Sequence, residues 1–100
     1  MKLLSLQLKN FRTYESLQID FASRLSFITG PNANGKTNIL EAIGMLSLGK
    51  SFRGANDEDM VRRDAAGYYI ECRYEKDGQA FDINLGLDQS GKKVRRRIRL

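Results

Sequence analysis

The stretch Gly30-Pro31-Asn32-Ala33-Asn34-Gly35-Lys36-Thr37 decides the fold of this chain, because it has the form G-x-x-x-x-G-K-[ST] of a phosphate-binding P-loop. Its glycines allow the backbone to turn tightly enough to point successive N–H groups at a phosphate chain. Lys36 is placed to reach the outer phosphates, and the hydroxyl of Thr37 is placed to bind Mg²⁺. The start of the following helix adds about half a positive elementary charge. The alternative interpretation is a glycine-rich structural turn.

The flanking segments favour the P-loop. Residues 25–29 form an apolar run without clean alternation, which predicts a central strand covered on both faces. Residues 35–48 are rich in helix formers, and Gly49 follows as a stop signal. We expect the helix to expose Glu41 and to bury an apolar stripe of Ile39, Leu40, Ile43 and Leu46.

Two strands are predicted before the loop. Apolar side chains alternate with polar ones over residues 4–9 and again over residues 17–21, which is the pattern of half-buried strands. Between them lies a polar turn with two aromatic residues, so the strands are expected to pair as a hairpin. Phe11, in this turn, is expected to anchor in the core.

The segment after the helix is predicted to be a loop over residues 50–54, in which Phe52 is a second core anchor. Asp57 is expected to cap a short helix over residues 58–63. Period-two alternation then returns over residues 68–75, 81–88 and 93–100. Asp77-Gly78 is a tight-turn signal between the first two of these strands, so they predict a three-stranded antiparallel meander.

The net charge of +5 is concentrated at one end of the chain. Residues 1–90 carry 11 of the 17 basic side chains and all 12 acidic ones, so residues 91–100 are purely basic. Lys93, Arg95, Arg97 and Arg99 would line one face of the last strand about 7 Å apart, which approximates the phosphate repeat of a DNA strand. The competing interpretation is an edge strand that is charged to prevent aggregation.

Composition excludes several classes of protein. One cysteine and no histidine exclude an internal disulfide and a Cys/His metal site, and Cys72 is expected to be a buried apolar residue. The first residues alternate rather than form a continuous apolar run, so no signal peptide is expected. No run is long enough to span a membrane, and a cytoplasmic protein without a membrane partner is predicted.

Three segments together resemble a known family. Residues 8–14 read LKNFRTY, the P-loop continues as Asn38 and ILEAI, and residues 48–53 read LGKSFR. In this order they are similar to the N-terminus of RecF, the bacterial DNA-repair ATPase related to the SMC and ABC families. The resemblance implies an α/β P-loop NTPase fold: the N-terminal lobe of an ABC/SMC-type head in residues 1–66 and an antiparallel β meander in residues 67–100, together part of one incomplete domain.

The resemblance also implies roles for particular residues. ATP and Mg²⁺ are the expected cofactors, with Thr37 as the Mg²⁺ ligand. The residues expected to hold the phosphates are Gly30, Pro31, Asn32, Ala33, Asn34, Gly35, Lys36, Thr37 and Asn38. Arg12 resembles an SMC-type arginine that approaches the phosphates, and Arg53 resembles one that lies near nucleotide or DNA.

Members of the family bind ATP, dimerise around it, hydrolyse it slowly and bind DNA at junctions between single and double strands. The expected partners are therefore single-stranded and gapped double-stranded DNA, a second copy of the protein, and functionally RecR, RecO and RecA. The expected processes are DNA repair, recombination and replication and the SOS response.

The chain departs from the family in what it lacks. The Walker B carboxylates and the signature motif have no counterpart here, so no group is available to position the attacking water. These 100 residues are therefore predicted not to hydrolyse ATP alone, and no catalytic residue is assigned. Two alternatives stay open: the head of another SMC-like or OLD-nuclease-like ATPase, and a basic binding module whose loop holds an anion structurally.

Overall fold

The computed structural model describes residues 1–21 and 33–100. The predicted central strand over residues 25–29 and the P-loop residues Gly30, Pro31 and Asn32 lie outside the described residues. Seven elements follow in chain order: β1 (Lys2–Phe11), β2 (Tyr14–Asp20), α2 (Ala33–Leu48), α3 (Asp57–Met60), β3 (Tyr68–Lys76), β4 (Gln79–Leu87) and β5 (Lys93–Arg99).

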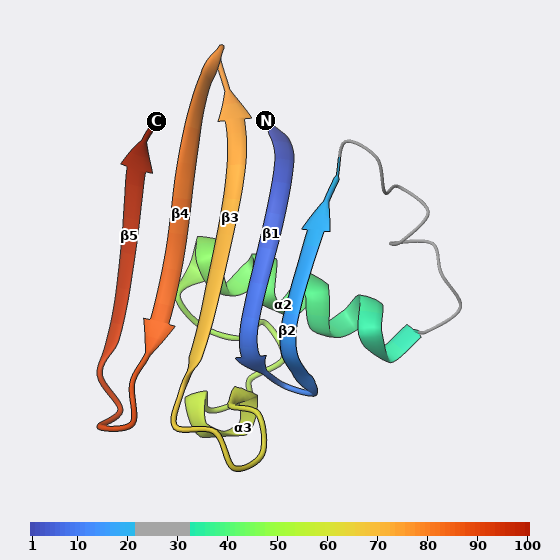
Figure 1. The fold of residues 1–100 in the computed structure, drawn as a ribbon, viewed down its shortest axis with the longest axis vertical. Coiled ribbons are helices and arrows are strands. Elements are labelled where there is room, and N and C mark those ends of the chain that lie inside the picture. The colour runs from blue at the N-terminus through green and yellow to red at the C-terminus, as the bar shows by residue number, and fades with distance from the viewer. Residues whose placement is uncertain (22–32) are drawn as a thin grey trace.

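The five described strands form one antiparallel sheet in the order β2-β1-β3-β4-β5 (Figure 1). The predicted hairpin is confirmed, since Phe11 pairs with Tyr14 across a two-residue turn. The predicted meander is also confirmed, and Asp77 and Gly78 make its first turn with positive φ angles of 54° and 77°. The pairing of β1 with β3, which joins hairpin and meander into a single sheet, was not predicted.

One face of the sheet carries the core. Leu8 lies opposite Leu17 on β2 and Ile70 on β3, and Ile70 lies opposite Leu85 on β4. Helix α2 crosses this face and closes the core (Figure 1). The side chains that α2 adds to the buried cluster are Ile39, Ala42, Met45 and Leu46. Phe11 is fully buried and Cys72 is 2% exposed, as predicted.

Helix α2 differs from its prediction in which side chains it buries. It begins at Ala33 and ends before Gly49, whose φ is 75° and whose N–H donates to the Met45 carbonyl at 2.8 Å. Leu40, expected in the apolar stripe, is 52% exposed. Glu41, expected on the surface, is fully buried. The apolar pattern marks which side of the helix meets the sheet, but it does not show that a loop covers the adjacent side.

The segment after α2 corrects two further predictions. Phe52 is 55% exposed and is not a core anchor; its ring instead lies beside Gly44, whose missing side chain leaves room for it. The short helix α3 is capped by Asn56 and not by Asp57, and it ends at Met60. The capping residue is therefore one position earlier than expected, with the Asp59 carboxylate accepting a hydrogen bond from the Asn56 N–H at 3.3 Å.

Among the described residues, no helix has the length and apolar character needed to cross a membrane.

Candidate functional site

The second half of the P-loop motif forms the start of α2. Ala33, Asn34, Gly35, Lys36 and Thr37 are all helical, so the motif leads directly into the helix as predicted. Lys36 and Thr37 are half-buried in its first turns. The backbone N–H groups at this end of a helix have no partner within the helix and favour an anion.

A pocket of about 640 Å³ opens beside these turns. Four of its lining residues are ones that the sequence predicts to contact nucleotide or DNA, and they come from three separate segments. The β1–β2 turn contributes Arg12, α2 contributes Thr37 and Asn38, and the following loop contributes Arg53; Thr13, Asp59 and Val61 complete the lining. The fold thus brings basic and hydroxyl side chains from distant parts of the sequence to one pocket. The two that are farthest apart, Arg12 and Arg53, are separated by 41 positions.

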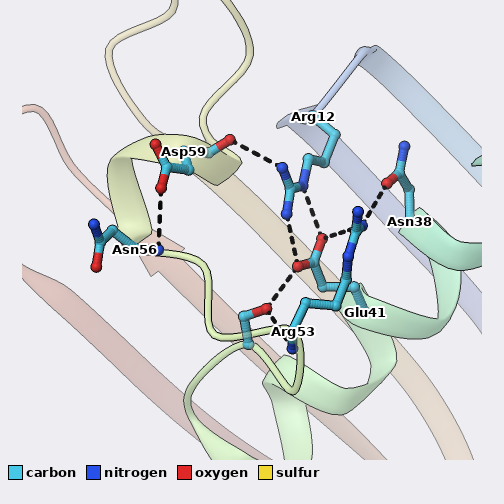
Figure 2. Close-up of polar contacts among 7 residues, drawn as sticks. Arg12, Asn38, Glu41, Arg53, Asn56 and Asp59 are labelled. Carbon is cyan, nitrogen blue, oxygen red and sulfur yellow. Dashed lines mark hydrogen bonds and ion pairs between the residues drawn. The ribbon is translucent and has the colours of Figure 1, made fainter.

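Glu41 lies at the centre of the polar contacts around this pocket (Figure 2). Its two carboxylate oxygens accept hydrogen bonds from Nε and Nη2 of Arg12, each at 2.8 Å. The hydroxyl of Ser51 donates to Oε2 at 2.6 Å. Charge-assisted bonds in this two-pronged geometry are about twice as strong as neutral ones and fix orientation. Glu41 therefore orients Arg12 rigidly.

Arg53 is held more loosely than Arg12. Its Nη1 lies 3.5 Å from Oε1 of Glu41 and donates to Oδ1 of Asn38 at 3.1 Å (Figure 2). The Arg53 side chain is 39% exposed, against 21% for Arg12. Its backbone is fixed, because the Arg53 N–H donates to the Ser51 hydroxyl at 3.0 Å. The two arginines thus share one carboxylate unequally.

These contacts set the charge of the cluster. Burial on its own raises the pKa of Glu41, but hydrogen bonds from Arg12 and Ser51 and the charges of Arg12 and Arg53 outweigh it, so the pKa is lowered. The hydrogen bond to Glu41 correspondingly raises the pKa of Arg12. Glu41 is therefore ionised at neutral pH, and the three charged groups carry a net charge of about +1.

The position of Arg12 is determined by its backbone as well. Arg12 has a φ of 55°, a left-handed conformation that costs a non-glycine residue about 1–2 kcal/mol. Its N–H donates to the Met60 carbonyl at 2.7 Å, and the neighbouring Asn10 carbonyl accepts from the Arg62 N–H at 2.8 Å. The turn is thus tied to the end of α3, which keeps Arg12 above Glu41.

The basic residues of β5 do not line this pocket. Lys93 and Arg95 share the core-facing side of the sheet, where they lie opposite Leu87 and Leu85. Nζ of Lys93 donates to the Gly49 carbonyl at 2.8 Å, and Nη1 of Arg95 donates to the carbonyls of Leu46 and Ser47 at 3.2 and 3.1 Å. These two residues therefore bind the C-terminal end of α2.

Arg97 and Arg99 lie further along the same face and are exposed. The guanidinium of Arg97 stands 5.9 Å from the centroid of the Phe81 ring. The prediction that the four basic residues share one face is confirmed, and their contact with DNA stays a prediction.

Sequence reasoning missed Glu41 and Ser51 as parts of the site. A signal for Glu41 was present, because Glu41 follows Thr37 by four positions and therefore lies on the same side of the helix. A carboxylate on that side faces the same region as the two arginines predicted there. Ser51 lies in the segment LGKSFR that carries the family resemblance, but a serine in a loop does not by itself indicate a hydrogen bond to a buried carboxylate.

Comparison with known proteins identifies the family. A family model described as AAA domain matches residues 5–100. The chain belongs to this AAA family. Among curated relatives, RecF from Chlamydia caviae, described as a DNA replication and repair protein, is 40% identical over 94 residues, which are 94% of this chain and 26% of the relative. RecF from Clostridioides difficile is 42% identical over 96 residues, again 94% and 26%.

Solved structures of RecF and of an SMC head are also similar to this AAA-family chain. A structure of the recombination mediator protein RecF with ATP in the RecFOR pathway superimposes with a TM-score of 0.80 at 30% identity, over 99% of this chain and 27% of that one. The SMC head domain from Thermotoga maritima gives 0.69 at 25% identity, over 97% and 37%. The predicted resemblance to RecF and the predicted P-loop ATPase head fold are confirmed. The chain spans about a quarter of the RecF relatives it matches.

Proposed function

We propose that this chain is the nucleotide-binding part of a RecF-type ATPase and that it binds ATP with Mg²⁺. The observation that carries the proposal is the pocket beside α2, which brings Arg12, Thr37, Asn38 and Arg53 together at the end of the P-loop sequence. Basic side chains, helix N–H groups and a hydroxyl are the groups that bind a triphosphate. A RecF structure containing ATP, to which the chain is similar, supports the identity of the nucleotide.

The residues expected to hold the phosphates are those numbered 30–38 in the sequence, together with Arg12. Thr37 is proposed as the Mg²⁺ ligand, because it lines the pocket and its side chain carries a hydroxyl oxygen, the kind of donor that Mg²⁺ prefers. Thr37 would hold the metal, whose positive charge would offset part of the charge of the phosphates. We do not expect these 100 residues to hydrolyse ATP alone, because their sequence contains no Walker B carboxylates and no signature motif.

Lys36→Ala tests the proposal directly. We expect Mg-ATP affinity, measured by calorimetric titration, to fall at least about tenfold, since a charged contact to phosphate contributes about 1.5–3 kcal/mol. Lys50→Ala is the matched control, because Lys50 is an exposed lysine in the loop after α2. Unchanged affinity in Lys36→Ala, or affinity that does not depend on Mg²⁺, would contradict the proposal and favour a structural anion loop.

The function of the whole protein is proposed from its relatives. RecF relatives are described as DNA replication and repair proteins. We propose that the protein containing this chain binds single-stranded and gapped double-stranded DNA, closes an ATP-dependent homodimer, and works with RecR and RecO to assist RecA loading in recombination and repair in the cytoplasm. The DNA contacts that we propose for it are Arg53 and the exposed part of the basic face of β5, formed by Arg97 and Arg99. Lys93 and Arg95 lie on the same face but bind the end of α2.

A further inference from the structure

The two arginines of the pocket differ in how each is held by Glu41. Arg12 uses Nε and Nη2 to bind both carboxylate oxygens at 2.8 Å, and its Nη1 lies 3.4 Å from the Asp59 carbonyl. Three separate contacts therefore fix the plane of its guanidinium. Within the described part of the chain, the side-chain contacts of Arg53 all run through Nη1, at 3.1 and 3.5 Å.

Glu41 itself is fixed by its surroundings. It is fully buried, it projects from the third turn of α2, and the Ser51 hydroxyl donates to its Oε2 at 2.6 Å. A carboxylate in this position cannot follow a departing arginine. Arg12, which makes the shorter contacts with Glu41, is thus held in one orientation. Arg53 can exchange its 3.5 Å contact with Glu41 for a contact with another anion at little cost in free energy.

We propose that Glu41 is a positioning residue that orients Arg12 as the fixed phosphate donor of the pocket, while Arg53 is recruited only when the phosphates arrive. The proposal rests on the nucleotide binding proposed above. It assigns to Glu41 an effect on nucleotide affinity that acts through Arg12. Orienting a donor in advance lowers the entropic cost of binding, which is the general advantage of preorganised sites.

The effect can be isolated with a double-mutant cycle. Glu41→Gln keeps the shape of the side chain but removes the charge and one of the two oxygens that Arg12 binds. We expect it to weaken Mg-ATP binding about tenfold, and to weaken it less than about twofold when Arg12→Gln is already present. In an Arg53→Gln background the tenfold loss should persist. Glu75→Gln, an exposed carboxylate near the end of β3, should leave affinity unchanged.

Two outcomes of the cycle would overturn the proposal. One is an affinity of Glu41→Gln within twofold of the unmodified protein. The other is a tenfold loss that persists in the Arg12→Gln background, which would show a general effect on the fold. The Lys36→Ala titration tests the proposed nucleotide site separately. Normal Mg-ATP affinity in Lys36→Ala would contradict the proposed nucleotide site itself, whatever the effect of Glu41→Gln.

A second measurement needs no variant and decides the case where Glu41→Gln does not fold. The ¹⁵N-labelled side-chain Nε–H groups of Arg12 and Arg53 are followed by NMR in the unmodified protein while Mg-ATP is added. The Arg12 signal should be protected from solvent exchange before and after addition, and the Arg53 signal should become protected only afterwards. Equal protection of both arginines without nucleotide, or an Arg12 signal that moves as much as that of Arg53, would refute the proposal.

Discussion

At the scale of single residues, the pocket depends on a buried charge that is stabilised by its partners. Glu41 has no exposed surface, and burying an unpaired carboxylate is strongly unfavourable. Arg12 and Ser51 satisfy both oxygens, and within the described residues no buried side-chain nitrogen or oxygen lacks a hydrogen bond. The same contacts that orient Arg12 therefore also maintain the fold around α2.

Because Glu41 depends on Arg12, a second substitution at Glu41 should restore part of the stability that is lost when Arg12 is replaced. Arg12→Gln should lower the free energy of unfolding by about 2–3 kcal/mol, slightly less than for a fully buried ion pair because the Arg12 side chain is 21% exposed. Adding Glu41→Gln should restore part of that loss, because it removes the carboxylate left without its arginine. Urea denaturation of both variants measures the difference. A double variant less stable than Arg12→Gln alone would contradict the argument.

The lowered pKa of Glu41 predicts how stability varies with pH. Because the folded pKa lies below the ordinary value of 4.5, the unfolded chain takes up a proton more readily than the folded one. The contribution of Glu41 should be fully present above about pH 4.5 and should be lost as pH falls through the folded pKa. Urea denaturation is measured from neutral pH to about pH 3. The difference in the free energy of unfolding between the unmodified protein and Glu41→Gln should shrink as the pH falls.

The control for the pH series is Glu75→Gln, which changes the net charge by the same amount at an exposed position. Its difference from the unmodified protein should stay small across the series. If the Glu41→Gln gap widened on acidification, the folded pKa would lie above the ordinary value and the cluster would not stabilise the ionised form.

Single residues show where sequence reasoning succeeded and where it stopped. Arg12, Thr37, Asn38 and Arg53, each predicted to lie near nucleotide or DNA, do line one pocket, whereas their contact with phosphate stays a prediction. Glu41 was misplaced because the polarity of a side chain indicates exposure only where no oppositely charged partner covers it. Phe52 was misplaced for the converse reason: its size suggested burial, but its ring covers Gly44 at the surface.

At the scale of elements, β5 and α2 are joined by contacts at the end of the helix. The last carbonyls of a helix carry a partial negative charge and have no partners within it. Arg95 reaches the carbonyls of Leu46 and Ser47, and Lys93 reaches that of Gly49. Lys93 also pairs with Asp57, at the start of α3, at 3.3 Å. The basic strand thus stabilises both helices.

These contacts predict a cost for Arg95→Gln. We expect the free energy of unfolding to fall by about 0.5–1 kcal/mol at low salt, because a cation at a helix C-terminus contributes about that much, and the loss should shrink as salt is added. Thermal unfolding at two salt concentrations measures both effects. Arg99→Gln is the matched control on the same exposed strand. Equal losses in the two variants would mean that the helix end gains nothing from Arg95.

The strands themselves were predictable, but their assembly was not. Period-two alternation located all five described strands, and the Asp77-Gly78 signal located the first meander turn. The pairing of β1 with β3 joins residues about 65 positions apart, and nothing in local alternation selects one distant partner over another. The core face followed from alternation, whereas the covering of Glu41 by the loop after α2 did not.

At the scale of the whole molecule, some basic side chains of β5 bind other parts of the protein and others are exposed and free to bind a partner. Lys93 and Arg95 are directed to the end of α2, whereas Arg97 and Arg99 are exposed beyond it. Among the described strands, β5 is the last in the sheet, so this charge also discourages edge-to-edge pairing. Contact with DNA and protection of an edge therefore predict different effects of the same substitutions.

Salt dependence separates these two roles. If gapped DNA lies along β5, Arg97→Gln combined with Arg99→Gln should flatten the slope of log affinity against log salt by about 2, since each lost phosphate contact removes about 0.9. Arg95→Gln should leave the slope nearly unchanged, because its guanidinium is bound to helix carbonyls. Fluorescence anisotropy with a gapped duplex measures the slopes. An unchanged slope in the double variant would leave β5 as a protected edge, and DNA would then have to bind elsewhere on the molecule.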